Sequence, residues 1–416
     1  MKVEELFRVA LGLESPWAVS RVEFSGEPKQ LDIWLDFPAG SRFPCPECDQ
    51  DIRGAYDSTE RTWRHLNFFE HQTLLHARLP RVECPTHGVK TVAVPWARSN
   101  VGFTLLMEAY ILLLTQGGMT AAQVARTLGV HDTRIWRVLD HYVEDARARA
   151  DHGGVTTVGI DETSRARGHD YISVFTDMSP TSPRRVIFAC AGRDADAVRQ
   201  FTQDLQAHQG APEKVTDVCC DMSKAYIRGV ADHLPRAAIT FDRFHIMKLA
   251  GDAIDQVRRA EVAERPELKK TRYLWLRNAW HGLPPGQEAR WEQVRRLRCR
   301  THRAWMLKTV LQDIFEHSSP EQGPELLQKW CAWAARSRLS PMVEVARSLR
   351  RHWQGVVRWF QSHIANGVVE AINGLIQSAK RRARGFRSVR NLITMIYLLL
   401  GKLDLQLPSI APVPVR

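Results

Sequence analysis

Three acidic residues that are far apart in the sequence occupy positions where carboxylates could bind metal ions. Val155–Ile160 is rich in β-branched residues, which predicts a buried strand, and Asp161 ends it. Val215–Cys220 predicts a second strand, and Asp221 ends that one. Glu370 lies in a run with helical periodicity. Because carboxylate oxygens are the ligands that Mg²⁺ and Mn²⁺ prefer, these acids predict a site for divalent ions.

The chemistry that such a site supports is the breaking of phosphodiester bonds. Two divalent ions held roughly 3.5–4 Å apart activate a nucleophile, neutralise the phosphate and stabilise the leaving alkoxide. We expect Asp161 to bridge two Mg²⁺ or Mn²⁺ ions, and Asp221 and Glu370 to bind one ion each. The scissile phosphate would complete the coordination, so no side chain has to act as general base or covalent nucleophile.

Each of these acids has a competitor or another role. Asp221 could instead cap the helix expected after it. Glu162 could take the place of its neighbour Asp161. Asp242, which ends a further expected strand, and Glu344, which lies in another expected helix, are also candidates. The joint pattern of two strand-end aspartates and a helical glutamate that precedes a basic stretch favours the first set.

The elements that must position these acids have the order of a ribonuclease-H-like fold, an α/β fold with a mixed sheet. Three strands come first, followed by a helix, a strand, a second helix and a fifth strand. In this fold the first and fourth strands are neighbours, which would bring Asp161 beside Asp221. The expected strands are Val155–Asp161, Tyr171–Asp177, Arg184–Cys190, Val215–Asp221 and Ala237–Asp242, and the helices are Ala195–Gln206 and Lys224–Leu234.

Glu370 belongs to an expected helix, Asn366–Arg384, that leads into a basic segment. At 100° per residue one face of this helix holds Glu370, Asn373, Gly374, Gln377, Lys380, Arg381 and Arg384. From Lys380 to Arg390 the segment is basic and contains no acid, which favours phosphate contacts over a solvated tail. The expected DNA contacts there are Lys380, Arg381, Arg384 and Arg387.

Two short motifs near the N-terminus have the spacing of zinc ligands. Cys45 and Cys48 are separated by two residues, as are Cys84 and His87, and each pair includes a proline. Four such ligands close a tetrahedral shell around Zn²⁺ and leave no open position for catalysis. Residues 1–98 are therefore expected to contain a structural zinc ribbon.

Residues 99–150 have the pattern of a helix-turn-helix. Ala121–Leu128 and Thr133–Arg149 are amphipathic, and Gly129 lies in the turn between them. In this motif the second helix enters the major groove of DNA. The alternative is an ordinary helical hairpin that does not bind DNA. The expected DNA-contacting residues are Thr133, Arg134 and Arg137.

The composition indicates which kinds of partner the protein can bind. Lys and Arg outnumber Asp and Glu by 58 to 46, a net charge of +12 that suits a polyanion. Met1–Glu5 is charged and the apolar runs are too short to span a bilayer, so we expect neither a signal peptide nor a membrane partner, and a location in the cytoplasm. Residues 262–360, rich in Trp and Arg, predict an all-helical insertion in a catalytic domain of residues 151–261 and 361–405, followed by a tail, 406–416.

Together these motifs resemble the DDE transposases of bacterial insertion sequences, and among them the ISL-three family. The segments that carry the resemblance are Gly159–Glu162, Cys220–Tyr226, Phe241–Leu249, Asn366–Gln377 and Lys380–Arg387. The resemblance implies that Asp161, Asp221 and Glu370 are the DDE acids and that Asp242–Lys248 lies near them. It also implies binding to terminal inverted repeats in double-stranded DNA, donor-strand cleavage that leaves a 3′-hydroxyl, and strand transfer to a target. A homodimer or larger assembly would hold two DNA ends.

Two other functions remain open. A metal-dependent nuclease on the same fold would cut DNA without joining strands. A DNA-binding regulator with an inactive core would bind specific DNA without cutting it, although the complete set of acids argues against this reading.

Overall fold

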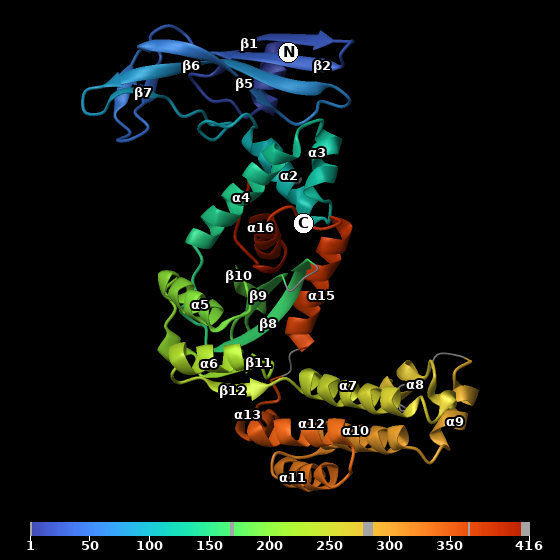
Figure 1. Ribbon diagram of the computed structural model, residues 1–416. Coiled ribbons are helices and arrows are strands. Elements are labelled where there is room, and N and C mark those ends of the chain that lie inside the picture. The colour runs from blue at the N-terminus through green and yellow to red at the C-terminus, as the bar shows by residue number, and fades with distance from the viewer. Residues whose placement is uncertain (1, 167–169, 278–285, 365–366, 409–416) are drawn as a thin grey trace, which may run out of the picture. The chain divides into compact units, whose positions relative to one another are not determined.

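The computed structural model describes residues 2–166, 170–277, 286–364 and 367–408 (Figure 1). The chain forms two compact units, Met1–Ala146 with Asp404–Arg416, and Arg147–Leu403. Each unit contains its own hydrophobic core cluster. In the described part of the chain, no helix is long and apolar enough to cross a membrane.

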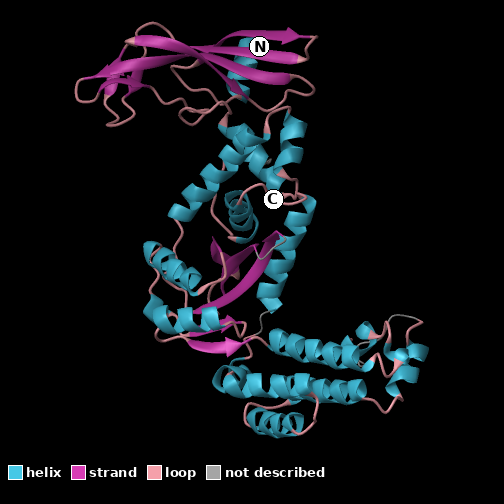
Figure 2. Ribbon diagram, viewed as in Figure 1, coloured by secondary structure: helices cyan, strands magenta, loops and turns pink. Residues whose placement is uncertain are grey.

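The first unit begins with the helix α1 (Val3–Ala10) and a five-stranded sheet, drawn in magenta in Figure 2. The strand order is β1-β2-β6-β5, and β7 pairs with β6. The strands are β1 (Ala18–Ser25), β2 (Gln30–Asp36), β5 (Asp57–Arg64), β6 (Gln72–Cys84) and β7 (Gly88–Thr91), while β3 (Arg42–Pro44) pairs with β4 (Asp51–Arg53). Along β2, Leu31, Ile33 and Leu35 are buried and alternate with half-buried residues, which matches a strand covered on one side.

The helix-turn-helix that the sequence predicts is present in the same unit. Its helices are α2 (Leu105–Gln116), α3 (Ala121–Leu128) and α4 (Asp132–Ala148). Thr120 and Gln123 form a reciprocal capping box that starts α3. Gly129 ends α3 with a φ of 65°, a left-handed conformation that glycine adopts without strain. The turn therefore has a specific local cause in the sequence.

The second unit is built on a mixed sheet with the order β10-β9-β8-β11-β12. β8 and β11 are parallel, with Gly159 opposite Cys219, so the predicted adjacency of the first and fourth strands is confirmed. The expected end of the first strand at Asp161 is wrong, because β8 runs on to Ala166 in pairing with β9 after β11 has ended. The strands are β8 (Thr157–Ala166), β9 (Asp170–Asp177), β10 (Arg185–Ala191), β11 (Asp217–Cys220) and β12 (Ala238–Phe241).

Helices pack on both faces of this sheet, and alternation along β8 assigns each side chain to one face. Val158 and Ile160 are buried in the core shared with α5 and α6. Gly159 faces α15, which passes so closely that an added Cβ would lie 2.6 Å from Val369. Asp161 has the same parity as Gly159 and so faces α15 as well. The helices are α5 (Ala195–Ala207), α6 (Lys224–His233), α15 (Gly367–Arg382) and α16 (Val389–Leu400).

Between β12 and α15 the chain forms the helical insertion that the sequence predicts. Its helices are α7 (Arg243–Glu261), α8 (Arg272–Leu276), α9 (Glu288–Arg295), α10 (Arg300–His317), α11 (Gln322–Ala335), α12 (Ser340–Arg351), α13 (Trp353–Val357) and α14 (Trp359–Ser362). α7 packs against α10 and α12, and α11 packs on both of these (Figure 1). Trp275 and Trp330 are fully buried, so tryptophan serves here as core material.

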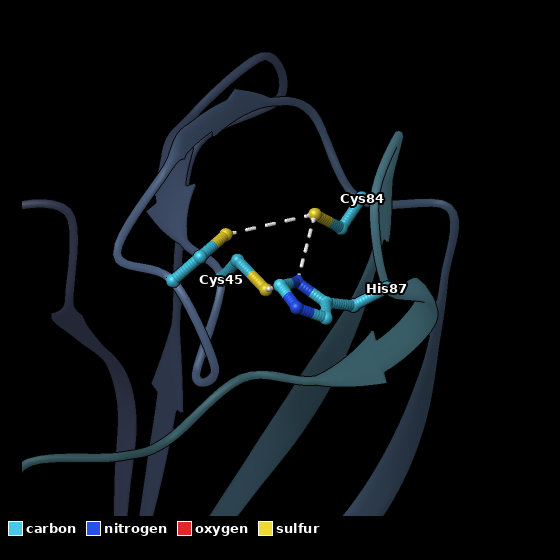
Figure 3. Close-up of side chains that lie close together, drawn as sticks. Cys45, Cys84 and His87 are labelled. Carbon is cyan, nitrogen blue, oxygen red and sulfur yellow. Dashed lines mark hydrogen bonds between the residues drawn. The ribbon is translucent and has the colours of Figure 1, made fainter.

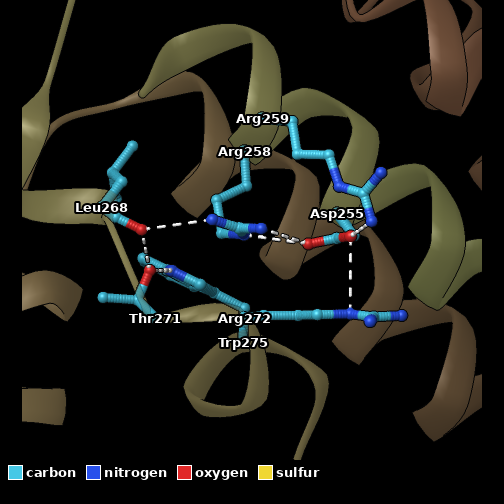
Figure 4. Close-up of polar contacts among 7 residues, drawn as sticks. All are labelled: Asp255, Arg258, Arg259, Leu268, Thr271, Arg272 and Trp275. Carbon is cyan, nitrogen blue, oxygen red and sulfur yellow. Dashed lines mark hydrogen bonds and ion pairs between the residues drawn. The ribbon is translucent and has the colours of Figure 1, made fainter. Parts of the chain in front are cut away.

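A buried carboxylate ties α7 to α8 (Figure 4). Asp255 accepts hydrogen bonds of 2.9 and 2.7 Å from Arg258 and lies 2.8 Å from Arg259 and 3.4 Å from Arg272. Burial acts to raise the pKa of Asp255, but the Arg258 hydrogen bond and the neighbouring guanidinium groups hold it below its usual value. The ionised form is therefore favoured in the fold, and this network braces α7 against α8.

Candidate active site and metal centre

The four expected zinc ligands come together beside β6 and β7, and Figure 3 labels three of them, Cys45, Cys84 and His87. The Sγ atoms of Cys48 and Cys84 are 3.8 Å apart, and His87 Nδ1 lies 3.6 Å from Cys84 Sγ and 3.8 Å from Cys45 Sγ. In a tetrahedral zinc site, Zn–S and Zn–N lengths of roughly 2.3 and 2.0–2.1 Å separate two sulfurs by about 3.8 Å and a sulfur from a nitrogen by about 3.6 Å. The side chains therefore have the spacing of a closed zinc-ribbon site.

The surroundings of Cys84 favour the thiolate that a metal requires. Burial acts to raise the pKa of Cys84, but hydrogen bonds from the backbone of His87 and Thr86 and from the His87 ring lower it to about 6. Cys84 and Cys45 are buried, whereas Cys48 is exposed. The site is accordingly a structural metal centre at one end of the first unit's sheet.

The structure brings Asp161, Asp221 and Glu370 to one region of the second unit. Asp161 lies on β8, Asp221 directly follows the neighbouring β11, and Glu370 lies in the first turn of α15, which packs on β8. Asn366, where the sequence places the start of this helix, lies outside the described residues. Residues separated by up to about half of the chain thus converge on one face of the sheet.

Hydrogen bonds fix two of the three carboxylates. Asp161 Oδ1 accepts from the backbone N–H of Glu162 at 2.7 Å, and Asp161 Oδ2 accepts from the side-chain amide of Asn373 at 2.6 Å. Asp221 Oδ1 accepts from the backbone N–H of Ser223 at 3.0 Å. Asp221 thus helps to form the turn before α6, yet this contact uses only one of its oxygens.

These acids share an electrostatic field that favours cations. Burial raises the pKa of Asp161, and the charges of Asp221 and Asp242 raise it further. Burial also raises the pKa of Glu370, followed by the charge of Asp242. The hydrogen bond to Asp242 raises the pKa of His245, against the effect of burial, and Asp161 adds to the rise. Carboxylates that oppose each other's ionisation in this way are relieved by a bound cation.

The donor set fits Mg²⁺ or Mn²⁺ better than a closed zinc shell. All three residues offer carboxylate oxygens, the hard ligands that these ions prefer. Among the described residues, the groups whose possible ligand atoms all lie within 4.8 Å of one another do not include these three acids. Two ions that share three carboxylates and complete their shells with water and substrate oxygens do not require so close a group.

Two competing acids lie elsewhere. Glu162 points to the opposite face of β8 from its neighbour and lies 3.4 Å from Arg193. Glu344 is exposed on α12, within the helical insertion, and pairs with Arg347. The geometry therefore favours Asp161 over Glu162 and Glu370 over Glu344.

The third competitor, Asp242, does lie with the acids. Its Oδ1 accepts from the backbone N–H of Phe244 at 3.1 Å, which caps α7, and its Oδ2 lies 3.2 Å from His245 Nδ1. His245 is not named as a site residue from the sequence, although it belongs to Asp242–Lys248, the segment that the resemblance places near the acids. Its position three residues after a strand-end aspartate, at the start of a helix, was the available signal.

The face predicted for α15 is largely the face that contacts β8. Gln377 donates to Thr163 Oγ1 at 2.5 Å, and Lys380 Nζ donates to the Ser164 carbonyl at 2.6 Å. Lys380, expected to contact DNA, is thus partly engaged within the protein. α15 ends at Arg382, and Arg384 has a φ of 54°, so placing it on the helical face was wrong. Three of the expected DNA contacts are exposed, namely Arg381, Arg384 and Arg387.

Of the DNA contacts expected in the helix-turn-helix, two are likewise exposed and one is engaged within the protein. Thr133 and Arg137 are exposed at the start of α4. Arg134 is half-buried, lies 4.0 Å from the ring of Phe103 and donates to the Gly102 carbonyl at 3.0 Å. Its guanidinium therefore packs the motif together, which a sequence pattern alone does not reveal.

Another compact group of possible ligands has a protein partner already. His152, Asp204 and His208 offer atoms within 4.8 Å of one another. Arg147, however, donates to both oxygens of Asp204, at 2.7 and 2.9 Å. The carboxylate is thus neutralised by a guanidinium, and the group forms an ion-pair network at the start of the second unit.

Known proteins match the chain in three consecutive segments. Residues 41–87 match the zinc-finger of transposases IS204, IS1001, IS1096 and IS1165, residues 92–143 match the helix-turn-helix domain of transposase family ISL3, and residues 158–396 match the ISL3 transposase domain. The last segment covers more than half of the chain and contains Asp161, Asp221 and Glu370.

Relatives match over nearly the full length. The transposase for insertion sequence element IS1557 of Mycobacterium tuberculosis is 28% identical over 442 residues, 96% of each chain. The transposase for insertion sequence element IS1001 of Bordetella parapertussis is 27% identical, over 91% of this chain and 94% of its own. A simian T-cell lymphotropic virus intasome chain aligns with 45% of this chain and 75% of its own at a TM-score of 0.17 and 13% identity, too distant to support an argument. On the family matches, the chain belongs to the ISL3 family of insertion-sequence transposases, which are DDE enzymes.

Proposed function

We propose that this transposase binds the terminal inverted repeats of its insertion sequence and catalyses metal-dependent cleavage and transfer of DNA strands. The observation that carries the proposal is the convergence of Asp161, Asp221 and Glu370 on one face of the sheet, from three separate parts of the sequence. The catalytic roles of the three acids are part of the proposal. So is the assignment of Asp161 to both ions and of Asp221 and Glu370 to one ion each.

In this mechanism the protein supplies a rigid carboxylate site. Two bound Mg²⁺ or Mn²⁺ ions would supply an activated nucleophile and neutralise charge on the phosphate. Asp161 is fixed at both oxygens by Glu162 and Asn373, so its remaining lone pairs keep constant directions. The hydroxyl that cleavage exposes at the 3′ end of the element is the nucleophile for joining to target DNA.

DNA recognition falls to the first unit and to the basic stretch that begins in the last turn of α15. Thr133 and Arg137 are exposed where α4 would enter the major groove, and Arg134 supports this helix by packing on Phe103. Arg381, Arg384 and Arg387 would contact phosphates near the acids, with Lys380 shared between Ser164 and DNA. The zinc ribbon would hold the preceding strands in place when Zn²⁺ is bound, and zinc-free purified protein would contradict that role.

The proposed domains have boundaries at residues 98, 150, 261, 360 and 405. In chain order they are the zinc-ribbon region, the helix-turn-helix, the first part of the catalytic core, the helical insertion, the second part of the core and the tail. Because both ends of an element must be held together for transfer, we also propose that at least two chains assemble on DNA.

The central test is a cleavage and joining assay on labelled inverted-repeat DNA with Mg²⁺ or Mn²⁺ and a target plasmid. Glu370→Gln and Asp221→Asn are expected to lower cleavage by more than about a thousandfold, because each removes a metal ligand. Glu344→Gln and Asp232→Asn are matched controls, since both residues are exposed and lie away from the acids.

Each outcome separates the candidate functions. Wild-type cleavage without joined product would indicate a nuclease, and specific binding without any cleavage would indicate a regulator. Full activity of Glu370→Gln would remove Glu370 from the site.

A further inference from the structure

Asn373 is the one residue of α15 whose side chain reaches a proposed metal ligand through a hydrogen bond in the described structure. Its Nδ2 donates to Asp161 Oδ2 at 2.6 Å, across 212 residues of sequence. Asn373 lies one helical turn after Glu370, so the two side chains share a face of α15.

The orientation of this amide is set by its surroundings. A carboxylate oxygen can only accept, so the amide nitrogen must face Asp161, and a flipped amide would place two acceptors against each other. The Oδ1 atom is consequently turned away, and it is buried without a hydrogen-bond partner among the described residues. Burying an unpaired acceptor destabilises a fold, so this arrangement is unfavourable for stability alone.

The contact has a distinct effect on the two oxygens of Asp161. Oδ1 is held by the Glu162 backbone at 2.7 Å and Oδ2 by Asn373. With one protein donor on each oxygen, each keeps lone-pair capacity for a cation, which is the arrangement that a bridging carboxylate needs. Without the Asn373 donor, the Asp161 carboxylate could rotate about its Cβ–Cγ bond, and Oδ2 would lose this orientation.

We propose that Asn373 is a positioning residue of the active site, which fixes the Asp161 carboxylate in the orientation that metal binding needs. The inference rests on the proposed function, since it concerns the same ions. Gln377 and Lys380, further along α15, contact Thr163 and Ser164 and dock the helix on β8. Asn373 differs from them because its partner is a proposed ligand.

The test measures Mn²⁺ binding to the full-length, DNA-free protein by electron paramagnetic resonance. Asn373→Ala is expected to raise the free Mn²⁺ concentration at half-saturation about tenfold or more, the usual effect of removing a residue that orients a metal ligand. Gln377→Ala is the control, because it loses a helix–strand contact but keeps the donor to Asp161, and its half-saturation is expected within about twofold of wild type. Asp161→Asn gives the binding that remains without the site.

A second variant separates orientation from polarity. Asn373→Asp has nearly the same shape but lacks the N–H donor, so its cleavage of inverted-repeat DNA at limiting Mg²⁺ is expected to fall about tenfold or more. Thermal unfolding and a mobility-shift assay verify that each variant folds and binds DNA.

Three results decide between the ideas. Equal Mn²⁺ binding by wild type and Asn373→Ala overturns the positioning role, whatever the cleavage assay shows. Wild-type cleavage by Asn373→Asp overturns it as well. Absence of cleavage by the wild type, together with weakened Mn²⁺ binding by Asn373→Ala, overturns the proposed catalysis and retains the positioning role.

Discussion

Glu370 illustrates how a half-buried carboxylate can oppose the fold that holds it. Burial and the charge of Asp242 raise its pKa above the usual value, so the ionised form is less stable in the folded chain than in the unfolded chain. Such a group contributes to stability while it is protonated. The free energy of unfolding therefore falls as the pH rises from the unfolded pKa through the folded one.

This linkage gives a prediction about stability in the absence of Mg²⁺ and Mn²⁺. At neutral pH, Glu370→Gln is expected to unfold at a higher temperature than wild type, because it carries no charge against Asp242. The difference is expected to vanish near about pH 4, where the wild-type carboxyl protonates in the unfolded chain as well. Calorimetry at several pH values measures it, and Glu344→Gln should show no such gain.

For single residues, the sequence predicts groups that lie close together along the chain, but it does not predict which distant residues will contact each other. The zinc ligands follow from two short motifs, since each turn directs its own pair. The contact between Asp161 and Asn373 joins positions 212 residues apart, and no local pattern encodes it. The packing of Arg134 on Phe103 could not be predicted for the same reason, because Phe103 lies on an earlier segment.

Among the elements, α15 and β8 decide the geometry of the site, and Gly159 decides how closely they approach. A Cβ at this position would lie 2.5 Å from Met178 Sδ and 2.6 Å from Val369 Cγ2. Real Cβ atoms do not tolerate such distances, so any larger residue must push α15 away from the strand. Because Glu370 follows Val369 directly, that displacement moves a proposed ligand.

Gly159→Ala is therefore expected to destabilise the protein by roughly 1–3 kcal/mol and to reduce cleavage, while binding to inverted-repeat DNA persists. Gly374→Ala, in α15, is the control. An added Cβ at Gly374 meets no atom within 4 Å and so does not displace this helix. Chemical denaturation and the cleavage assay provide the two measurements. Unchanged cleavage by a folded Gly159→Ala protein would show that the position of α15 is not critical.

The sequence predicts the order of these elements better than their ends. Apolar, β-branched runs identify the strands, and their order along the chain with the helices is that of a ribonuclease-H-like fold. The end of β8, however, depends on pairing with β9, which continues beyond Asp161. The end of α15 at Arg382 likewise depends on the left-handed turn at Arg384, a conformation that non-glycine residues rarely adopt.

For the whole molecule, the surplus of basic residues matters most where it meets DNA. The net charge is +12, yet many arginines pair with acids within the protein, as Arg147 does with Asp204 and Arg258 with Asp255. The stretch from Lys380 to Arg390, which begins in the last turn of α15, contains no acid. Counterion release should therefore depend on particular arginines more than on total charge.

Replacing Arg381, Arg384 and Arg387 together by alanine is expected to weaken DNA binding at low salt. The slope of log K against log salt should become shallower by about 0.9 for each phosphate that the variant no longer neutralises. A triple alanine variant of Arg228, Arg295 and Arg296 removes the same charge from other exposed positions and should leave the slope near wild type. Fluorescence anisotropy between low and physiological salt distinguishes the two variants.

The helical insertion begins and ends at the same strand. α7 starts directly after β12, and α13 returns to β12 so closely that a Cβ on Gly355 would lie 2.4 Å from the Phe241 ring. A segment whose two ends meet on one strand can change length without moving the helix after it, as in domain insertion. The distance along the chain between the second acid and the third is thus uncoupled from their distance in space. Relatives can therefore enlarge, shrink or exchange this module while Glu370 keeps its place.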